Sequence, residues 1–132
     1  MGVVTDRTGT IAELAVELAL LRRYTNVLRP TLKSRYDLVF EDDGHFFRVQ
    51  VKHGRYKKGC IEFSTKSYCA FTKVHAPYLL SEIDYYGIYS SDLEKVYLIP
   101  RLNFDNKSKG SLRVDKDMRP YSLSKRAEDY EI

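Results

Sequence analysis

Residues 36–53 read YDLVFEDDGHFFRVQVKH. Aromatic and β-branched residues on both sides of the acidic turn at 41–44 predict two paired strands, over residues 35–40 and 45–53. Side chains alternate across a strand, so Gln50 and Lys52 are expected to share one face. The pairing also predicts that Asp37, near the start of the first strand, lies beside the end of the second.

This predicted hairpin gathers oxygen donors. The Asp37 carboxylate, the Gln50 side-chain carbonyl and the Val51 backbone carbonyl together suit a hard cation, of which Mg²⁺ is the expected one and Mn²⁺ the expected substitute. The Lys52 ammonium is expected beside this metal and its water. The hairpin therefore predicts a metal site at its open end.

The order of the other predicted elements indicates the fold class. Apolar residues at three- and four-residue spacing predict a helix over residues 8–24, namely Ile11, Leu14, Ala15, Leu18 and Leu21. Further strands are expected over 26–29, 59–63, 85–89, 95–99 and 111–114, with a helix-like segment over 67–74. This order predicts an α/β fold with a central mixed sheet flanked by helices. At 132 residues the chain is expected to form one domain, 1–132.

Asp37, Gln50 and Lys52 resemble the core motif of the PD-(D/E)XK nuclease superfamily, with Gln50 in place of the second acid. The segment GTIAE at 9–13 resembles the first-helix motif of that family, whose Glu reaches the metal site. A compact branch that contains intron-associated endonucleases and relatives of archaeal Holliday junction resolvases is similar at 82–86, 95–100, 111–113 and 127–132. The resemblance implies a restriction-endonuclease-like core.

Roles for the site residues follow from the resemblance. Asp37 would be the central metal ligand and Glu13 a second acidic ligand, with Glu17, four residues later, as the alternative. Gln50 and the Val51 carbonyl would complete the metal site. Lys52 would orient the attacking water and stabilise charge on the phosphate, which gives the catalytic set Glu13, Asp37, Gln50 and Lys52.

Basic residues on both sides of the predicted site indicate DNA contacts. The net charge is +4, from 22 Lys and Arg against 18 Asp and Glu, and the cations are concentrated near the hairpin. The expected DNA-contacting residues are Arg29, Lys33, Ser34 and Arg35, up to the start of the first strand, and His53, Arg55, Lys57 and Lys58, from the end of the second strand onward. A solvated basic face is the alternative, and turn chemistry explains Ser34 equally well.

The substrate expected first is branched DNA. The resemblance implies a Mg²⁺-dependent endodeoxyribonuclease that resolves Holliday junctions as a homodimer, because cutting two strands calls for two metal sites related by a two-fold axis. An apolar, aromatic-rich contact within residues 78–89 is the expected dimer interface. The alternatives are a site-specific intron homing endonuclease and a DNA-binding module whose metal site has decayed, with Gln50 as the relic.

The composition also predicts where the protein works. No apolar run approaches the roughly 20 residues that a membrane span needs, and no charged-then-apolar signal stands at the N-terminus. Cys60 and Cys69 lack zinc-ligand spacing and are expected to be reduced thiols. An intracellular, cytoplasmic protein that acts on DNA, without a membrane partner, is therefore expected.

Overall fold

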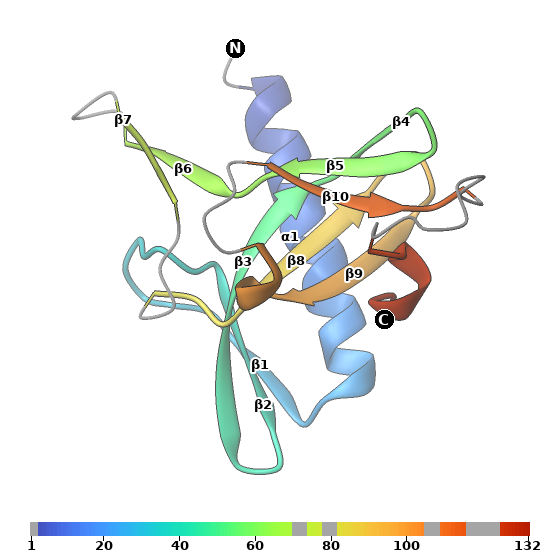
Figure 1. Ribbon diagram of the computed structural model, residues 1–132. Coiled ribbons are helices and arrows are strands. Elements are labelled where there is room, and N and C mark those ends of the chain that lie inside the picture. Colours follow the sequence, from blue (N-terminus) through green and yellow to red (C-terminus); the bar gives the residue numbers. More distant parts are fainter. Residues whose placement is uncertain (1–2, 70–73, 78–81, 105–108, 116–124) are drawn as a thin grey trace.

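The computed structural model describes residues 3–69, 74–77, 82–104, 109–115 and 125–132 (Figure 1). One helix and ten strands follow in the order α1 Val3–Arg23, β1 Asn26–Leu28, β2 Leu38–Asp42, β3 His45–His53, β4 Arg55–Lys57, β5 Cys60–Ser64, β6 Lys66–Cys69, β7 Val74–Pro77, β8 Tyr85–Ser90, β9 Lys95–Pro100 and β10 Lys109–Arg113. Short 3₁₀ helices cover Arg101–Phe104 and Ala127–Asp129. No described helix is long and apolar enough to cross a membrane.

The central sheet is mixed, with strand order β1-β2-β3-β8-β9. β3 and β8 run parallel, whereas the other neighbouring pairs are antiparallel. The β2–β3 hairpin turns at Asp43-Gly44, both with positive φ (50° and 79°), which matches the right-handed twist of the strands. The α/β class and the mixed sheet predicted from sequence are confirmed, although β2 begins three residues later than expected.

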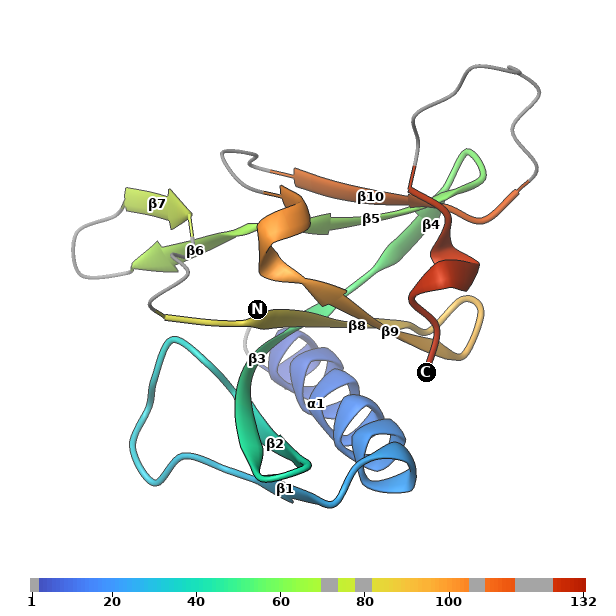
Figure 2. The ribbon, with the colours of Figure 1, turned by 60° about the horizontal axis from the view of Figure 1, so that its bottom comes forward.

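Helix α1 covers one face of this sheet (Figure 2). Its buried residues are Ala12, Val16 and Leu20, and they belong to one apolar cluster with Val49 of β3. Gly87 of β8 permits this close approach, because a Cβ there would lie 2.7 Å from Val16 Cγ1. The helix therefore packs through its smaller residues.

The apolar residues that predicted this helix point mostly outward. Ile11, Leu14, Leu18 and Leu21 are 48–54% exposed, so the spacing that predicted the helix marks its outer face. Helix α1 is apolar on two faces, and the periodicity of one face cannot reveal which of them meets the sheet.

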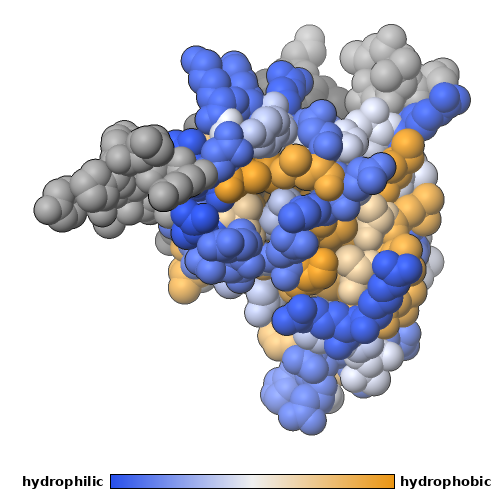
Figure 3. Space-filling view, turned by 90° about the vertical axis from the view of Figure 1, so that its right-hand side faces the viewer, coloured by the Kyte–Doolittle hydropathy of each residue, from blue (hydrophilic) through white to orange (hydrophobic). Residues whose placement is uncertain are grey.

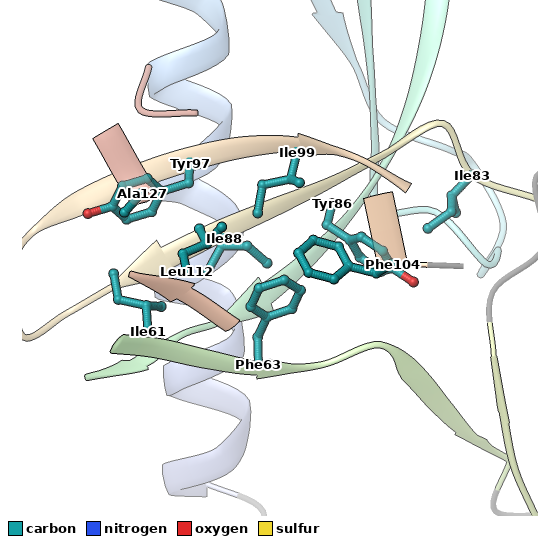
Figure 4. Close-up of a cluster of buried hydrophobic side chains, with 10 residues drawn as sticks. All are labelled: Ile61, Phe63, Ile83, Tyr86, Ile88, Tyr97, Ile99, Phe104, Leu112 and Ala127. Atoms are coloured by element: carbon teal, nitrogen blue, oxygen red, sulfur yellow. The ribbon is translucent and has the colours of Figure 1, made fainter. Parts of the chain in front are cut away.

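The opposite face of the central sheet is covered by a second sheet, of order β10-β5-β4. Ile61, Phe63 and Leu112 of this second sheet pack with Tyr86, Ile88 and other residues of the central sheet (Figure 4). The chain passes between the two sheets at Gly54, where a Cβ would meet Ile61 and Ile88 side chains at 2.5 and 2.7 Å. The expected alternation of Ile61 and Phe63 with Glu62 is thus confirmed.

The expectation of a helix-like segment over 67–74 is wrong for the residues that the structure describes. β6 and β7 pair there as an antiparallel hairpin, with Lys66 opposite Pro77 and Cys69 opposite Val74. Residues 70–73 lie outside the described part. The apolar positions within residues 67–74 form too short a stripe to favour a helix over a hairpin.

The C-terminal segment runs beside β9. The Leu98 N–H donates to the Tyr130 carbonyl at 2.9 Å, and the Ile132 N–H donates to the Val96 carbonyl at 3.0 Å. Ala127 is buried in the same core as Phe63. This acidic end of the chain is therefore part of the folded domain.

Candidate active site

Asp37 is fixed to strand β3 through backbone hydrogen bonds. Its N–H donates to the Val49 carbonyl at 2.8 Å, and its Oδ2 accepts the Val51 N–H at 2.9 Å. The pKa of Asp37 is raised to about 6, mainly by burial and also by the charge of Glu13, against the Val51 hydrogen bond and the charges of Lys52 and Arg29. The carboxylate is thus rigidly held and carries charge that its surroundings only partly compensate.

Lys52 lies on the same strand as the Val51 N–H that binds Asp37. Its Nζ donates to the Lys66 carbonyl at 3.1 Å, which ties β3 to the start of β6. Burial lowers the pKa of Lys52 and the charge of Arg35 lowers it further, whereas the charge of Asp37 raises it. The sequence did not predict the Lys66 carbonyl as a partner, because this contact depends on the path of the chain after β5.

The expected oxygen donors of β3 lie next to Asp37. The Gln50 Nε2 donates to the Val51 carbonyl at 3.4 Å, so the Gln50 amide lies over its own strand beside that carbonyl. Val51 links the two sides of the site, since its N–H binds Asp37. The structure therefore brings Asp37, Gln50, Val51 and Lys52 together.

The two acids of α1 meet Arg29, which follows β1. Arg29 makes a two-pronged contact with Glu17, Nε to Oε1 at 3.0 Å and Nη2 to Oε2 at 3.2 Å, and its Nη1 lies 3.5 Å from Glu13 Oε1. Glu13 also acts on Asp37 electrostatically. Both acids therefore contact Arg29, Glu17 at the shorter distances, and of the two it is Glu13 whose charge raises the pKa of Asp37.

The donor set fits a hard divalent cation. Two carboxylates, one amide and one backbone carbonyl are all oxygen ligands, as Mg²⁺ requires. Within the described residues, no group of three or more His, Cys, Asp or Glu side chains is placed to hold a metal. This agrees with Gln50 standing where a third acid would be, and the raised pKa of Asp37 indicates a place where added positive charge is favourable.

The expected DNA-contacting residues before β2 are partly engaged by the protein. The Ser34 hydroxyl donates to the Leu32 carbonyl at 3.0 Å, as turn chemistry predicts. Arg35 Nε donates to Glu82 at 2.6 Å, and Arg29 binds the α1 acids. Lys33 is exposed. In this segment the structure gives Arg29 and Arg35 acidic partners within the chain.

The expected DNA-contacting residues after β3 lie on or beside the second sheet. Arg55, Lys57 and Lys58 are exposed, and Lys58 and Gly59 form the predicted turn with φ of 51° and 78°. The His53 Nε2 lies 2.9 Å from the Ser91 hydroxyl. His53 and Arg55 also line a hollow of about 290 Å³, together with Glu62, Phe63, Ser64 and Lys109.

The polar residues of this hollow on β5 and β10 were missed from sequence. Lys109 begins strand β10, two residues before the strand that was expected over 111–114. Ser64 ends β5 and lies opposite Lys109 in the register. The alternation around Leu112 was the available signal, but it was too short to extend the strand back to Lys109.

Comparison with known proteins identifies the family. No curated protein matches the chain. A solved structure described as MepB is 14% identical with a TM-score of 0.40 and covers 85% of each chain. A solved structure described as a bacterial homing endonuclease, I-Ssp6803I, is 28% identical with a TM-score of 0.75, over 96% of this chain and 88% of that chain. A family described as PD-(D/E)XK endonuclease matches residues 3–132, and the chain therefore belongs to the PD-(D/E)XK endonuclease family.

Proposed function

We propose that this endonuclease uses Mg²⁺, with Mn²⁺ as a substitute, to cut both strands of duplex DNA at a specific site. One observation carries the chemistry: the Asp37 carboxylate is held on the Val51 N–H, next in sequence to the half-buried Lys52. The similarity to a homing endonuclease, 28% identical over nearly the whole chain, supports a specific duplex site. On this proposal the homing alternative takes precedence over junction resolution, the substrate expected first.

Asp37, Glu13, the Gln50 amide oxygen and the Val51 carbonyl would hold the metal ion. When bound, a divalent ion supplies an acidified water and stabilises charge on the phosphate. For this ligand role Asp37 must be ionised, which its pKa of about 6 allows at neutral pH. The hydrogen bond from the Val51 N–H fixes which oxygen of the carboxylate remains available.

Lys52 would act on the phosphate and its attacking water. Hydrolysis forms a bond from a water oxygen to phosphorus and breaks the bond to a sugar oxygen, while negative charge grows on the phosphate oxygens. The ammonium of Lys52 is already oriented by the Lys66 carbonyl at 3.1 Å. A cation that is already oriented stabilises that charge without reorganising.

Cutting two strands with one site per subunit calls for a homodimer. The burial of the described residues bears on where the contact between the two subunits lies. Residues 78–81 of the expected interface lie outside the described part. Tyr86 is 1% exposed in the core, so it cannot be a contact residue. Tyr85 and Tyr89 are half-buried against the α1 side of the sheet. Of the expected interface over 78–89, the described residues Tyr85, Tyr86 and Tyr89 thus pack within the sheet, which argues against a contact through them.

The proposed interface is instead the outer stripe of α1. Ile11, Leu14, Leu18 and Leu21 follow a 3-4-3 spacing, the heptad seam of a two-helix coiled coil. Figure 3 shows hydrophobic side chains reaching the surface among hydrophilic ones. Glu17 and Arg22 flank this seam on opposite sides. A parallel pairing with a second copy would place Glu17 of one protomer near Arg22 of its partner.

A substrate panel tests the proposed function. The protein with Mg²⁺ is given a duplex library with a long randomised segment, a four-way junction, a flap and a single strand. We expect a subset of duplexes to be cut in both strands while the junction is spared. Cutting of junctions regardless of their sequence would favour the resolvase expectation, and binding without any cleavage would favour the decayed module.

A further inference from the structure

The outer face of the second sheet carries polar and charged side chains in register. Because Ile61, Phe63 and Leu112 point into the core, the alternating residues of β4, β5 and β10 point away from it. Arg55, Glu62 and Ser111 lie opposite one another across the three strands, Lys57, Cys60 and Arg113 form a parallel row, and Ser64 pairs with Lys109. This face is built from segments far apart in the sequence.

Positive charge surrounds one acid on this face. Arg55, Lys57 and Lys109 are exposed, whereas the Glu62 side chain is 34% exposed on the middle strand. Its carboxylate is 3.8 Å from Lys109 Nζ. Glu62 and Lys109 also line the hollow of about 290 Å³. The cations thus lie on the two outer strands, β4 and β10, and the acid lies on the middle strand, with Ser111 beside it on β10 and Ser64 at the end of β5.

The same face adjoins the candidate active site. The Lys66 carbonyl accepts the Ser64 hydroxyl at 3.2 Å and the Lys52 ammonium at 3.1 Å. Ser64, on the outer face, is therefore one backbone carbonyl away from Lys52. A duplex whose phosphate is placed at Lys52 would continue along the outer face.

We propose that the outer face of β4, β5 and β10 reads base pairs in the major groove, with Ser64, Glu62 and Ser111 toward base edges and Arg55, Lys57 and Lys109 toward phosphates. This inference rests on the proposed cleavage of specific duplex DNA. The major groove admits a two-stranded antiparallel ribbon, which β5 and β10 form here, and a carboxylate repels phosphates but accepts a hydrogen bond from the cytosine N4 amine. The central place of Glu62 among cations thus fits a base contact and predicts a preference for cytosine at one position.

Selection from the randomised duplex library tests this assignment. Binding is measured in EDTA with Asp37→Asn as the parent, so that cleavage plays no part. We expect Glu62→Gln to lose about tenfold in preference at one cytosine position while other positions are unchanged. Lys109→Gln should weaken binding to all sequences equally and lower the slope of log affinity against log salt by about 0.9. Glu128→Gln and Lys95→Gln, on other surfaces, are the matched controls.

Other outcomes distinguish failure of the base-reading role from failure of the proposed cleavage of duplex DNA. If Glu62→Gln strengthens binding to all sequences equally, Glu62 only repels phosphates and the base-reading role fails. If the selected sequences are unchanged in both Glu62→Gln and Ser111→Ala, the face reads no bases. Ser111 is exposed, so its variant remains informative should Glu62→Gln fold poorly. Failure of the parent to bind any duplex would instead overturn the proposed function.

Discussion

Asp37 is the residue at which function and stability oppose each other. Its carboxylate must be ionised to bind a metal, yet burial raises its pKa to about 6. A carboxyl that is harder to ionise in the folded state than in the unfolded chain costs stability once it is charged. The site therefore resembles other functional sites, where an unfavourable charge is kept because the ligand needs it.

Replacing Asp37 with Asn should stabilise the metal-free protein at neutral pH. The raised pKa contributes stability that is present below about pH 4 and is lost as pH rises through about 6. The variant should therefore gain about 1–2 kcal/mol at pH 7, after allowance for partial exposure, and almost nothing at pH 4. Urea unfolding in EDTA at both pH values measures this difference.

Asp43→Asn is the control for that measurement. Asp43 is exposed in the β2–β3 turn with φ of 50°, a conformation that Asn also tolerates. It should leave stability unchanged at both pH values. An equal gain in the two variants at pH 7 would mean that general charge, and not the burial of Asp37, sets the effect.

The two acids of α1 should differ in their effect on metal binding. The charge of Glu13 raises the pKa of Asp37, whereas Glu17 makes the shorter contacts with Arg29. We expect Glu13→Gln to weaken Mn²⁺ binding about tenfold or more and Glu17→Gln to weaken it only a few-fold, by the usual scale of losing an acidic ligand or its support. Calorimetric titration with Mn²⁺ compares the two variants. The reverse order would mean that Glu17, one helical turn later, and not Glu13, is the metal ligand.

At the scale of elements, the position of Glu13 depends on how closely α1 packs on the sheet. Gly87→Ala would place a Cβ 2.7 Å from Val16 Cγ1 and 3.0 Å from Val49 Cγ1. Such overpacking should cost about 1–3 kcal/mol of unfolding free energy. It should also weaken Mn²⁺ binding, because α1 must move away from the sheet.

Gly9→Ala, on α1 itself, should have the opposite effect on stability. Nothing lies within 4 Å of a Cβ at Gly9, and Ala favours a helix over Gly by about 1 kcal/mol. Thermal unfolding should therefore show stabilisation for Gly9→Ala and destabilisation for Gly87→Ala. Equal effects would argue against close packing of α1 on β8.

The strands and the helix also show which parts of the fold and the site could be predicted from the sequence. The bounds of β3, His45–His53, were predicted correctly because alternation and the Asp43-Gly44 turn act locally. The same alternation brought Gln50 and Lys52 beside Asp37. The partners Arg29 and the Lys66 carbonyl were not predicted, because they come from loops whose paths are set by tertiary packing. The buried face of α1 could not be predicted because both its faces are apolar.

At the scale of the whole molecule, the outer stripe of α1 predicts self-association. Leu14→Glu combined with Leu18→Glu should convert a dimer into a monomer, since it places charges in the proposed seam. Sedimentation at micromolar concentration measures the change. Leu32→Glu is the control, because Leu32 is 79% exposed outside the helix and its replacement should leave the dimer intact. A wild-type protein that is monomeric both free and on DNA would contradict the interface.

The central claim is that Asp37 and Lys52 carry out metal-dependent cleavage of DNA. The most direct test is single-turnover cleavage of a selected duplex in Mg²⁺ or EDTA by the wild type, Asp37→Asn and Lys52→Met, with binding measured on the same DNA. We predict cleavage by the wild type in Mg²⁺ alone, and a loss of at least about 100-fold in both variants with binding within a few-fold. Near-normal cleavage by either variant, or by the wild type in EDTA, would contradict the account.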